Sequence, residues 1–131
     1  RAHTREMGEF GGLLKTVPLL GWFFVLAAFA SLGLPGLAHF PAEFQIFLAT
    51  LGTTPIAVVV ILGIAIIAGT FLKALRETFM GEPRDRWSKM PDLSPREILA
   101  VAPLLVLTVA TGVAPSWVLD VIHRTTSALV L

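Results

Sequence analysis

The stretch from Thr16 to Leu72 contains only two ionisable side chains, His39 and Glu43. A water-soluble domain needs a polar surface, and an apolar stretch of this length cannot supply one. Across the whole chain, 55% of the 131 residues are hydrophobic. The sequence therefore predicts an all-α integral membrane protein, because helices satisfy their own backbone hydrogen bonds in lipid.

Three apolar segments are candidates for crossing the membrane. A bilayer core about 30 Å thick takes about 20 helical residues to cross. Residues 55–79 and 98–119 have that length, and each predicts one transmembrane helix. Residues 17–51 would form a straight helix about 50 Å long, too long for one span and too short for two. This first segment must therefore bend, break or turn back.

Four helix-breaking residues interrupt the first apolar segment. They are Gly33, Pro35, Gly36 and Pro41. Proline lacks a backbone donor and its ring clashes with the preceding turn, and glycine has a low helix propensity. We therefore expect one helix to stop near Leu32 and a second to begin between Leu37 and Pro41. Backbone groups left unpaired in hydrocarbon are costly, so this break should face protein or water.

The lysine and arginine residues are distributed unevenly along the chain. Three precede residue 16, six lie between Lys73 and Arg96, and only Arg124 follows the last span. Basic residues gather on the cytoplasmic side of a membrane. A single crossing by residues 17–51 places the basic leader and the basic 80–97 loop on the same side, whereas two crossings would separate them. We therefore expect the first segment to cross once. The chain is then a cytoplasmic-side leader, a broken transmembrane helix, a second helix, a cytoplasmic-side loop, a third helix and a far-side segment. Their ranges are 1–16, 17–51, 55–79, 80–97, 98–119 and 120–131.

Three ionisable residues are candidates for a proton path. Glu43 lies two residues after Pro41, in the expected first turn of the second half-helix, and an intramembrane carboxylate is a functional candidate by default. It either exchanges protons or only hydrates at the interface. His39, one turn earlier, either relays a proton or hydrogen-bonds a freed carbonyl. Lys73 either joins the path or extends to the interface while pairing with Glu77.

The remaining motifs indicate structure rather than chemistry. Ser94 and Glu97 form a capping-box pattern around Pro95, which predicts the start of the last helix. The sequence has no cysteine, phosphate-binding glycine loop, metal-ligand cluster, nucleophile–base pair or basic-aromatic patch for nucleic acid. Three tryptophans at segment ends are typical of interface anchors. They are Trp22, Trp87 and Trp117.

Four blocks of sequence together resemble the C-terminal part of the antiporter-like membrane subunit of respiratory complex I, the chain M or chain 4 type of NADH-quinone oxidoreductase. They are "RAHTREMGEFGGLLKTVP", "ASLGLPGLAHFPAEFQIFL", "LKALRETFMGEP" and "DLSPREILAVAPLLVL". The resemblance implies the C-terminal end of an antiporter-like fold, with a discontinuous helix whose buried glutamate closes a line of protonatable residues. Glu43 occupies that position here. Pro41, Ala42 and His39 depart from the family's usual small aliphatic residue, glycine and small polar residue.

The resemblance also implies a function: a proton-translocating subunit, and thus an enzyme only as part of a redox-driven complex. No cofactor is expected in this chain, whereas NADH, flavin, iron–sulfur clusters and quinone would bind partner subunits. The expected surroundings are other membrane-arm subunits and the lipid of a bacterial inner membrane, with no nucleic acid. An Mrp-type cation/proton antiporter subunit and a non-conducting structural subunit are alternatives. The sequence leaves open the electron donor and whether the chain is a natural short subunit or part of a longer one.

Overall fold

The computed structural model describes residue 4 and residues 6–51 and 57–129, and in these residues all regular structure is helical. The α-helices follow one another along the chain with short connections between most of them. There are also two single 3-10 turns. The elements are η1 (Met7–Glu9), α1 (Leu13–Thr16), α2 (Pro18–Ser31), α3 (His39–Leu51), α4 (Ala57–Phe79), η2 (Asp85–Trp87), α5 (Pro95–Val113) and α6 (Ser116–Leu129).

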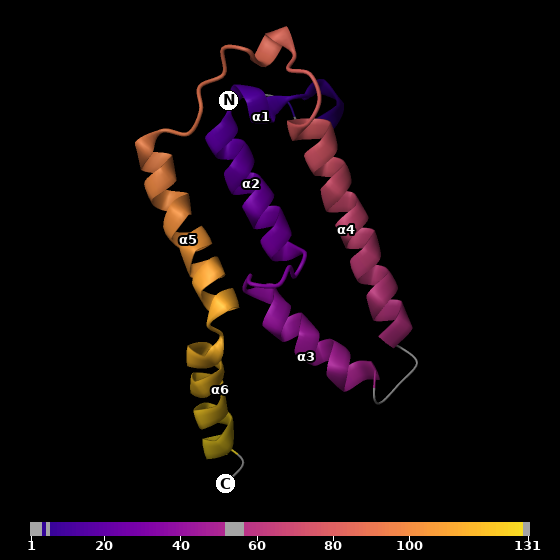
Figure 1. The fold of residues 1–131 in the computed structure, drawn as a ribbon, viewed down its shortest axis with the longest axis vertical. Coiled ribbons are helices and arrows are strands. Elements are labelled where there is room, and N and C mark those ends of the chain that lie inside the picture. The colour runs from indigo at the N-terminus through magenta and orange to yellow at the C-terminus, as the bar shows by residue number, and fades with distance from the viewer. Residues whose placement is uncertain (1–3, 5, 52–56, 130–131) are drawn as a thin grey trace.

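Three of these helices form the body of the molecule (Figure 1). The helices α4 and α5 lie on opposite sides of α2, and both contact it. At one end, which we call the loop end, α1 lies beside the connection from α4 to α5. The helix α6 extends to the other end, where the C-terminus lies, and α3 starts beside the end of α2 and turns away from it.

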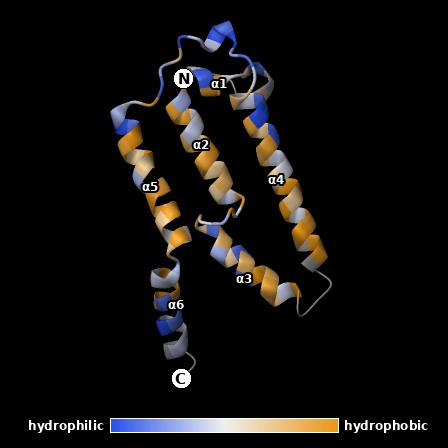
Figure 2. Cartoon of the chain, viewed as in Figure 1, coloured by the Kyte–Doolittle hydropathy of each residue, from blue (hydrophilic) through white to orange (hydrophobic). Residues whose placement is uncertain are grey.

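Helix length and composition differ among the apolar segments. The 19 residues of α5 are long and apolar enough to cross a membrane. The 14 residues of α2 are apolar but span only about 21 Å, less than a hydrocarbon core of about 30 Å. Figure 2 shows hydrophilic residues concentrated in the connection between α4 and α5 and along α6, while α2 and most of α4 and α5 are hydrophobic. The polar parts therefore lie at the two ends of the molecule.

The last apolar segment, expected as one helix over residues 98–119, is divided in the structure. The helix α5 ends at Val113, and α6 begins at Ser116. Between them Ala114 has the non-helical dihedral angles φ −128° and ψ 70°. Pro115 explains this difference, because its ring disfavours helical backbone at the preceding residue and it cannot donate a hydrogen bond.

The predicted start of α5 is confirmed. Ser94 has an extended backbone and serves as the N-cap, and Pro95 is the first helical residue. The Glu97 carboxylate accepts a hydrogen bond from the Ser94 backbone N–H at 2.7 Å. Ser94 and Glu97 thus form the capping box that the sequence pattern indicated. A capping box supplies partners for backbone groups that the start of a helix leaves unpaired.

The buried core lies at the loop end, where α1, α2, α4 and η2 meet. The aromatic rings of Phe24 on α2 and Phe79 on α4 lie with their centroids 4.9 Å apart. Neither α3 nor α5 contributes a buried side chain. The core consists of Leu13, Val17, Ala28, Leu75, Phe79 and Trp87.

Trp87 is part of this core, so its interpretation as an interface anchor is wrong. Only 6% of Trp87 is exposed, against 61% of Trp22 and 51% of Trp117. Its indole N–H donates a hydrogen bond to the Glu9 carbonyl oxygen at 3.0 Å. Its ring also stacks on Phe10, with centroids 5.3 Å apart. The polar atom and the apolar ring are therefore both satisfied inside the protein, and the side chain has no need of the membrane interface.

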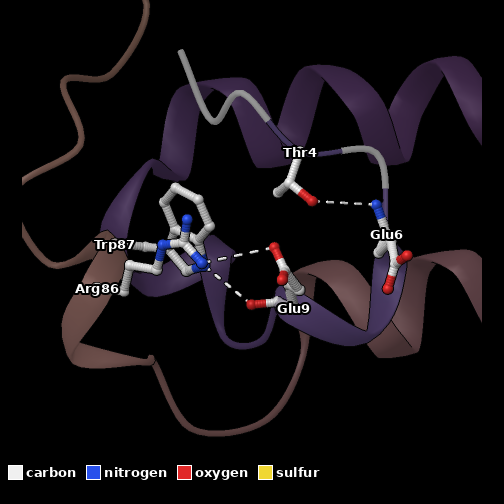
Figure 3. A network of polar contacts seen from close by, with 5 residues as sticks. All are labelled: Thr4, Glu6, Glu9, Arg86 and Trp87. Carbon is white, nitrogen blue, oxygen red and sulfur yellow. Dashed lines mark hydrogen bonds and ion pairs between the residues drawn. The ribbon is translucent and has the colours of Figure 1, made fainter.

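Figure 3 shows how η1 is joined to η2 around this tryptophan. The Arg86 guanidinium lies 5.0 Å from the centre of the Trp87 ring and 3.5 Å from a Glu9 carboxylate oxygen. Nearby, the Glu6 backbone N–H donates to the Thr4 hydroxyl at 3.4 Å. The contacts of Glu9 with Arg86 and Trp87 connect two segments that are almost eighty residues apart in the chain. They hold η1 against η2 at the loop end.

The N-terminal end of α2 is capped by a residue from the distant loop. The N-cap position is Val17, whose side chain has no hydrogen-bond acceptor. Instead, the Asp92 carboxylate accepts the backbone N–H of Leu19 at 2.9 Å and that of Leu20 at 3.0 Å. A carboxylate at this position also interacts favourably with the positive end of the helix dipole. Asp92 thus ties the α4–α5 connection to the start of α2.

Candidate functional site

The helix α2 ends in a turn that supplies partners for its last carbonyl groups. Gly33 has a left-handed backbone, with φ 65°. Its N–H donates to the Ala30 carbonyl, and the N–H of Leu34 donates to the Phe29 carbonyl, both at 3.3 Å. This pair of hydrogen bonds is a Schellman motif, which requires a residue that tolerates positive φ. Part of the backbone freed at this point is therefore satisfied within the turn.

The second helix begins at His39, inside the range from Leu37 to Pro41 that the sequence predicted. Pro35 and Gly36 lie in the connection, but α3 starts at His39, so Pro41 is its third residue and does not interrupt it. The first N–H groups of a helix have no intrahelical acceptor, so a proline costs little there. As a result Glu43 is the fifth residue of α3 and lies just beyond the first turn where it was expected.

The Glu43 side chain folds back onto the end of α2. A side-chain carbon added at Gly33 would overlap the Glu43 Oε2 atom and lie 2.7 Å from the carboxylate carbon. The Glu43 side chain is half-buried. Within the described residues, the carboxylate makes no hydrogen bond or ion pair. The structure thus brings Gly33 and Glu43 together and leaves the carboxylate unpaired there.

The turn is held from the other side by α5. A side-chain carbon added at Gly112 would overlap the backbone of Leu37, which is only 8% exposed. The helix α5 therefore approaches the turn at backbone distance. Small residues allow such close approach between helices in membranes. Sequence reasoning missed Gly112, and its only signal was a lone glycine near the end of an apolar helix.

No hydrogen bond or ion pair joins His39 or Lys73 to Glu43 in the described residues, although His39 lies one turn before Glu43 on α3. His39 is exposed at the first position of α3. Lys73 is exposed near the end of α4, and its ammonium lies 3.9 Å from the carboxylate of Glu77, so the predicted i,i+4 pair is present. That end of α4 lies at the loop end, since the Met80 carbonyl just beyond it accepts the Gly12 N–H at 2.9 Å. Within the described part of the chain, no cation approaches Glu43.

A cavity of about 280 Å³ lies on a neighbouring face of α3, against the end of α5 and α6. It has room for several water molecules, which occupy about 30 Å³ each in the liquid. Glu43 is not in its wall. In residues 4, 6–51 and 57–129 no cluster of three His, Cys, Asp or Glu side chains is suited to a metal ion. The polar residues of the cavity wall are Gln45, Thr111 and His123.

Comparison with known proteins identifies the family. Residues 1–69, more than half of the chain, match the family model described as "NADH:quinone oxidoreductase/Mrp antiporter, TM". The chain belongs to this family. Its membership agrees with the resemblance that the four sequence blocks carry. Because the family description names both quinone oxidoreductases and Mrp antiporters, membership alone does not separate the two.

Relatives within the NADH:quinone oxidoreductase/Mrp antiporter family are similar over nearly the whole chain. NADH-quinone oxidoreductase subunit M of Rickettsia prowazekii (strain Madrid E) is 35% identical over 100% of this chain and 27% of its own length. F(420)H(2) dehydrogenase subunit M of Methanosarcina mazei is 34% identical over 98% of this chain and 26% of its own. The corresponding values for NADH-quinone oxidoreductase subunit M of Mycobacterium tuberculosis (strain CDC 1551) are 32%, 94% and 22%. The chain thus spans about a quarter of the length of these relatives.

Proposed function

We propose that this chain acts as the C-terminal part of a proton-translocating membrane subunit in a redox-driven quinone oxidoreductase complex. In this proposal Glu43 carries a proton at the junction of α2 and α3, which together make one discontinuous crossing. Redox cofactors would be bound by partner subunits of the membrane complex. The similarity to subunit M of two kinds of dehydrogenase supports the assignment, and leaves the electron donor open.

One observation supports the role of Glu43 above the others: its carboxylate is half-buried against Gly33 without a fixed partner in the described residues. A carboxylate in an apolar environment is costly to keep charged unless a cation or water compensates it. Its proton occupancy then responds strongly to a charge that approaches or leaves. A carboxylate already bonded to donors would be far less responsive.

The electrostatics of the turn support the same role. Gly33 follows the last turn of α2, where carbonyl groups carry the negative end of the helix dipole. A negative charge at this end gains no stabilisation from α2, in contrast to a charge at the helix start. No cation among the described residues pairs with the carboxylate, so the proposal requires a compensating cation from another segment or subunit.

The test is proton pumping by the assembled complex in sealed vesicles. We expect Glu43→Gln to keep assembly and bound cofactors but to lower pumping, and with it the coupled electron transfer. Glu43→Asp should be milder because the carboxylate is retained. Glu77→Gln is the matched control, since it makes the same change on an exposed side chain paired with Lys73. If the Glu43→Gln variant pumped protons at the wild-type rate, the result would favour the alternative that the chain is part of a non-conducting structural subunit.

The proposed path also includes His39 and Lys73. The same pumping assay tests whether each of them transfers protons or has only a structural or interfacial role. A relay at His39 predicts that His39→Gln lowers pumping, whereas a purely structural histidine predicts no change. Interfacial extension of Lys73 predicts that Lys73→Gln pumps normally. The Mrp-type antiporter alternative predicts proton flux that depends on a gradient of a second cation and continues without quinone reduction.

The proposed topology has its own test. Three crossings place the leader and the α4–α5 connection on the cytoplasmic side and α6 on the far side. Because the chain has no cysteine, single cysteines at Ser88 and Ser127 report their sides without further changes. Both positions are exposed. We expect labelling from opposite sides of the membrane, and labelling of both from one side would overturn the crossing by α5 that lies between them.

A further inference from the structure

We propose that Gly33 is a positioning residue for the Glu43 carboxylate: the missing side chain at Gly33 is the space in which that carboxylate lies. This inference rests on the proposed function of Glu43 and adds a second residue to it. The sequence analysis treated Gly33 only as a helix breaker. The structure indicates two requirements for glycine at this position, a left-handed backbone and an open face.

The contact between the two residues is specific. The position that a side-chain carbon would take at Gly33 overlaps Glu43 Oε2, and lies 2.7 Å from the carboxylate carbon and 3.2 Å from Oε1. All three carboxylate atoms therefore lie around this one position. Gly36, three residues later in the same turn, has φ 90° and nothing within 4 Å of the equivalent position. The two glycines share a left-handed backbone and differ in what lies beside them.

The surroundings determine which group moves if Gly33 gains a side chain. The turn backbone is fixed by the hydrogen bonds of Gly33 and Leu34 to the end of α2. On its other side, the Leu37 backbone lies against Gly112 of α5. The Glu43 side chain has free torsions and no hydrogen bond or ion pair among the described residues. An added methyl group should therefore displace the carboxylate rather than the turn.

A displaced Glu43 carboxylate should interact less strongly with the charge changes that drive proton transfer in the proposed function. The proposed function needs Glu43 at a defined distance from a group that moves or changes charge, and electrostatic coupling falls as that distance grows. Misplacement of a reacting group by about 1 Å can cost on the order of a hundredfold in rate, and a flexible carboxylate should recover part of this. We therefore expect Gly33→Ala to lower proton pumping by roughly tenfold relative to Gly36→Ala.

The experiment compares Gly33→Ala with Gly36→Ala in the assembled complex in sealed vesicles. Both substitutions place alanine at positive φ, so both carry the same kind of backbone penalty. Only Gly33→Ala meets the Glu43 carboxylate. We expect lower pumping and an altered pH profile of pumping for Gly33→Ala, with near-wild-type behaviour for Gly36→Ala. Equal effects of the two substitutions would overturn the positioning role.

A rescue variant separates positioning from folding. Aspartate is one methylene shorter than glutamate, so its carboxylate should clear a methyl group at Gly33. Gly33→Ala combined with Glu43→Asp should therefore pump as well as Glu43→Asp alone. If Gly33→Ala prevents assembly, restored assembly in the double variant supports the contact, and continued failure shows that only the backbone of Gly33 matters and overturns it.

The two proposals fail in different ways. If Glu43→Gln pumps at the wild-type rate, Glu43 carries no proton, and the positioning role of Gly33 falls with it. If Glu43→Gln loses pumping while Gly33→Ala and Gly36→Ala behave alike, the role of Glu43 stands and that of Gly33 is wrong. These three single variants thus assign each outcome to one proposal.

Discussion

A carboxylate lies at each end of α2, and the two are held in opposite ways. At the start of the helix, Asp92 accepts two backbone N–H groups and completes the cap that Val17 cannot provide. At its end, Glu43 lies against Gly33 with no hydrogen bond or ion pair in the described residues. The same functional group thus joins two segments in one place and is left without a fixed partner in the other.

The two carboxylates differ because one lies beside the buried core of the protein and the other lies outside it. The loop end has a buried core, aromatic stacking and a hydrogen bond that the Trp87 indole N–H donates to the Glu9 carbonyl. The helix α3 has no buried side chain of its own. A site that must exchange protons with a neighbour benefits from being unpaired, whereas the ends of a membrane helix need fixed partners. Three substitutions test this contrast, in order of expected effect on stability.

Trp87→Ala should have the largest effect. Removing a buried tryptophan leaves a cavity, and comparable truncations cost about 3–5 kcal/mol. The indole hydrogen bond to the Glu9 carbonyl is lost as well. Thermal unfolding of the assembled complex in detergent measures the change. The control is Trp117→Ala, because Trp117 is 51% exposed and should tolerate truncation. Similar losses for the two variants would contradict the assignment of Trp87 to a self-contained core.

Asp92→Ala should have an intermediate effect, since losing a helix cap costs about 0.5–2 kcal/mol. Asp92→Asn should cost less, because an amide oxygen still accepts hydrogen bonds. The informative comparison is with Glu43→Gln. We expect Asp92→Asn to lower the unfolding temperature with little change in pumping per assembled complex, and Glu43→Gln to do the reverse. If both variants changed the same property, the contrast between the two carboxylates would be lost.

Lys73→Gln should have the smallest effect. Its ammonium is 3.9 Å from Glu77 and 70% of its side chain is exposed. Exposed i,i+4 pairs contribute about 0.3–0.5 kcal/mol, and salt screens them. The unfolding temperature should therefore change by little, and the change should shrink as ionic strength rises. A loss comparable to that of Asp92→Ala would mean that Lys73 contacts more than Glu77.

Local patterns predicted much of the helical framework. Two helix boundaries illustrate this. The capping box at the start of α5 was readable because Ser94 and Glu97 lie within four residues, and helix-breaking residues marked the turn at the end of α2. The division at Pro115 was missed because a long apolar run was given more weight than one proline near its end. The start of α3 at His39 lies within the predicted range, but Pro41 does not interrupt the helix as expected, because a helix accepts proline at its first positions.

The sequence by itself determined the apolar character of the segments, the turn after α2, the presence of one glutamate beyond it, and the family. These properties depend on composition and on residues close together in the chain. Only the tertiary structure decided that Asp92 caps α2, that Trp87 is buried, and that the Glu43 carboxylate lies in the space left by Gly33. Each of these depends on how separate segments pack, and a side chain's partner across such a contact leaves no periodic pattern in the sequence.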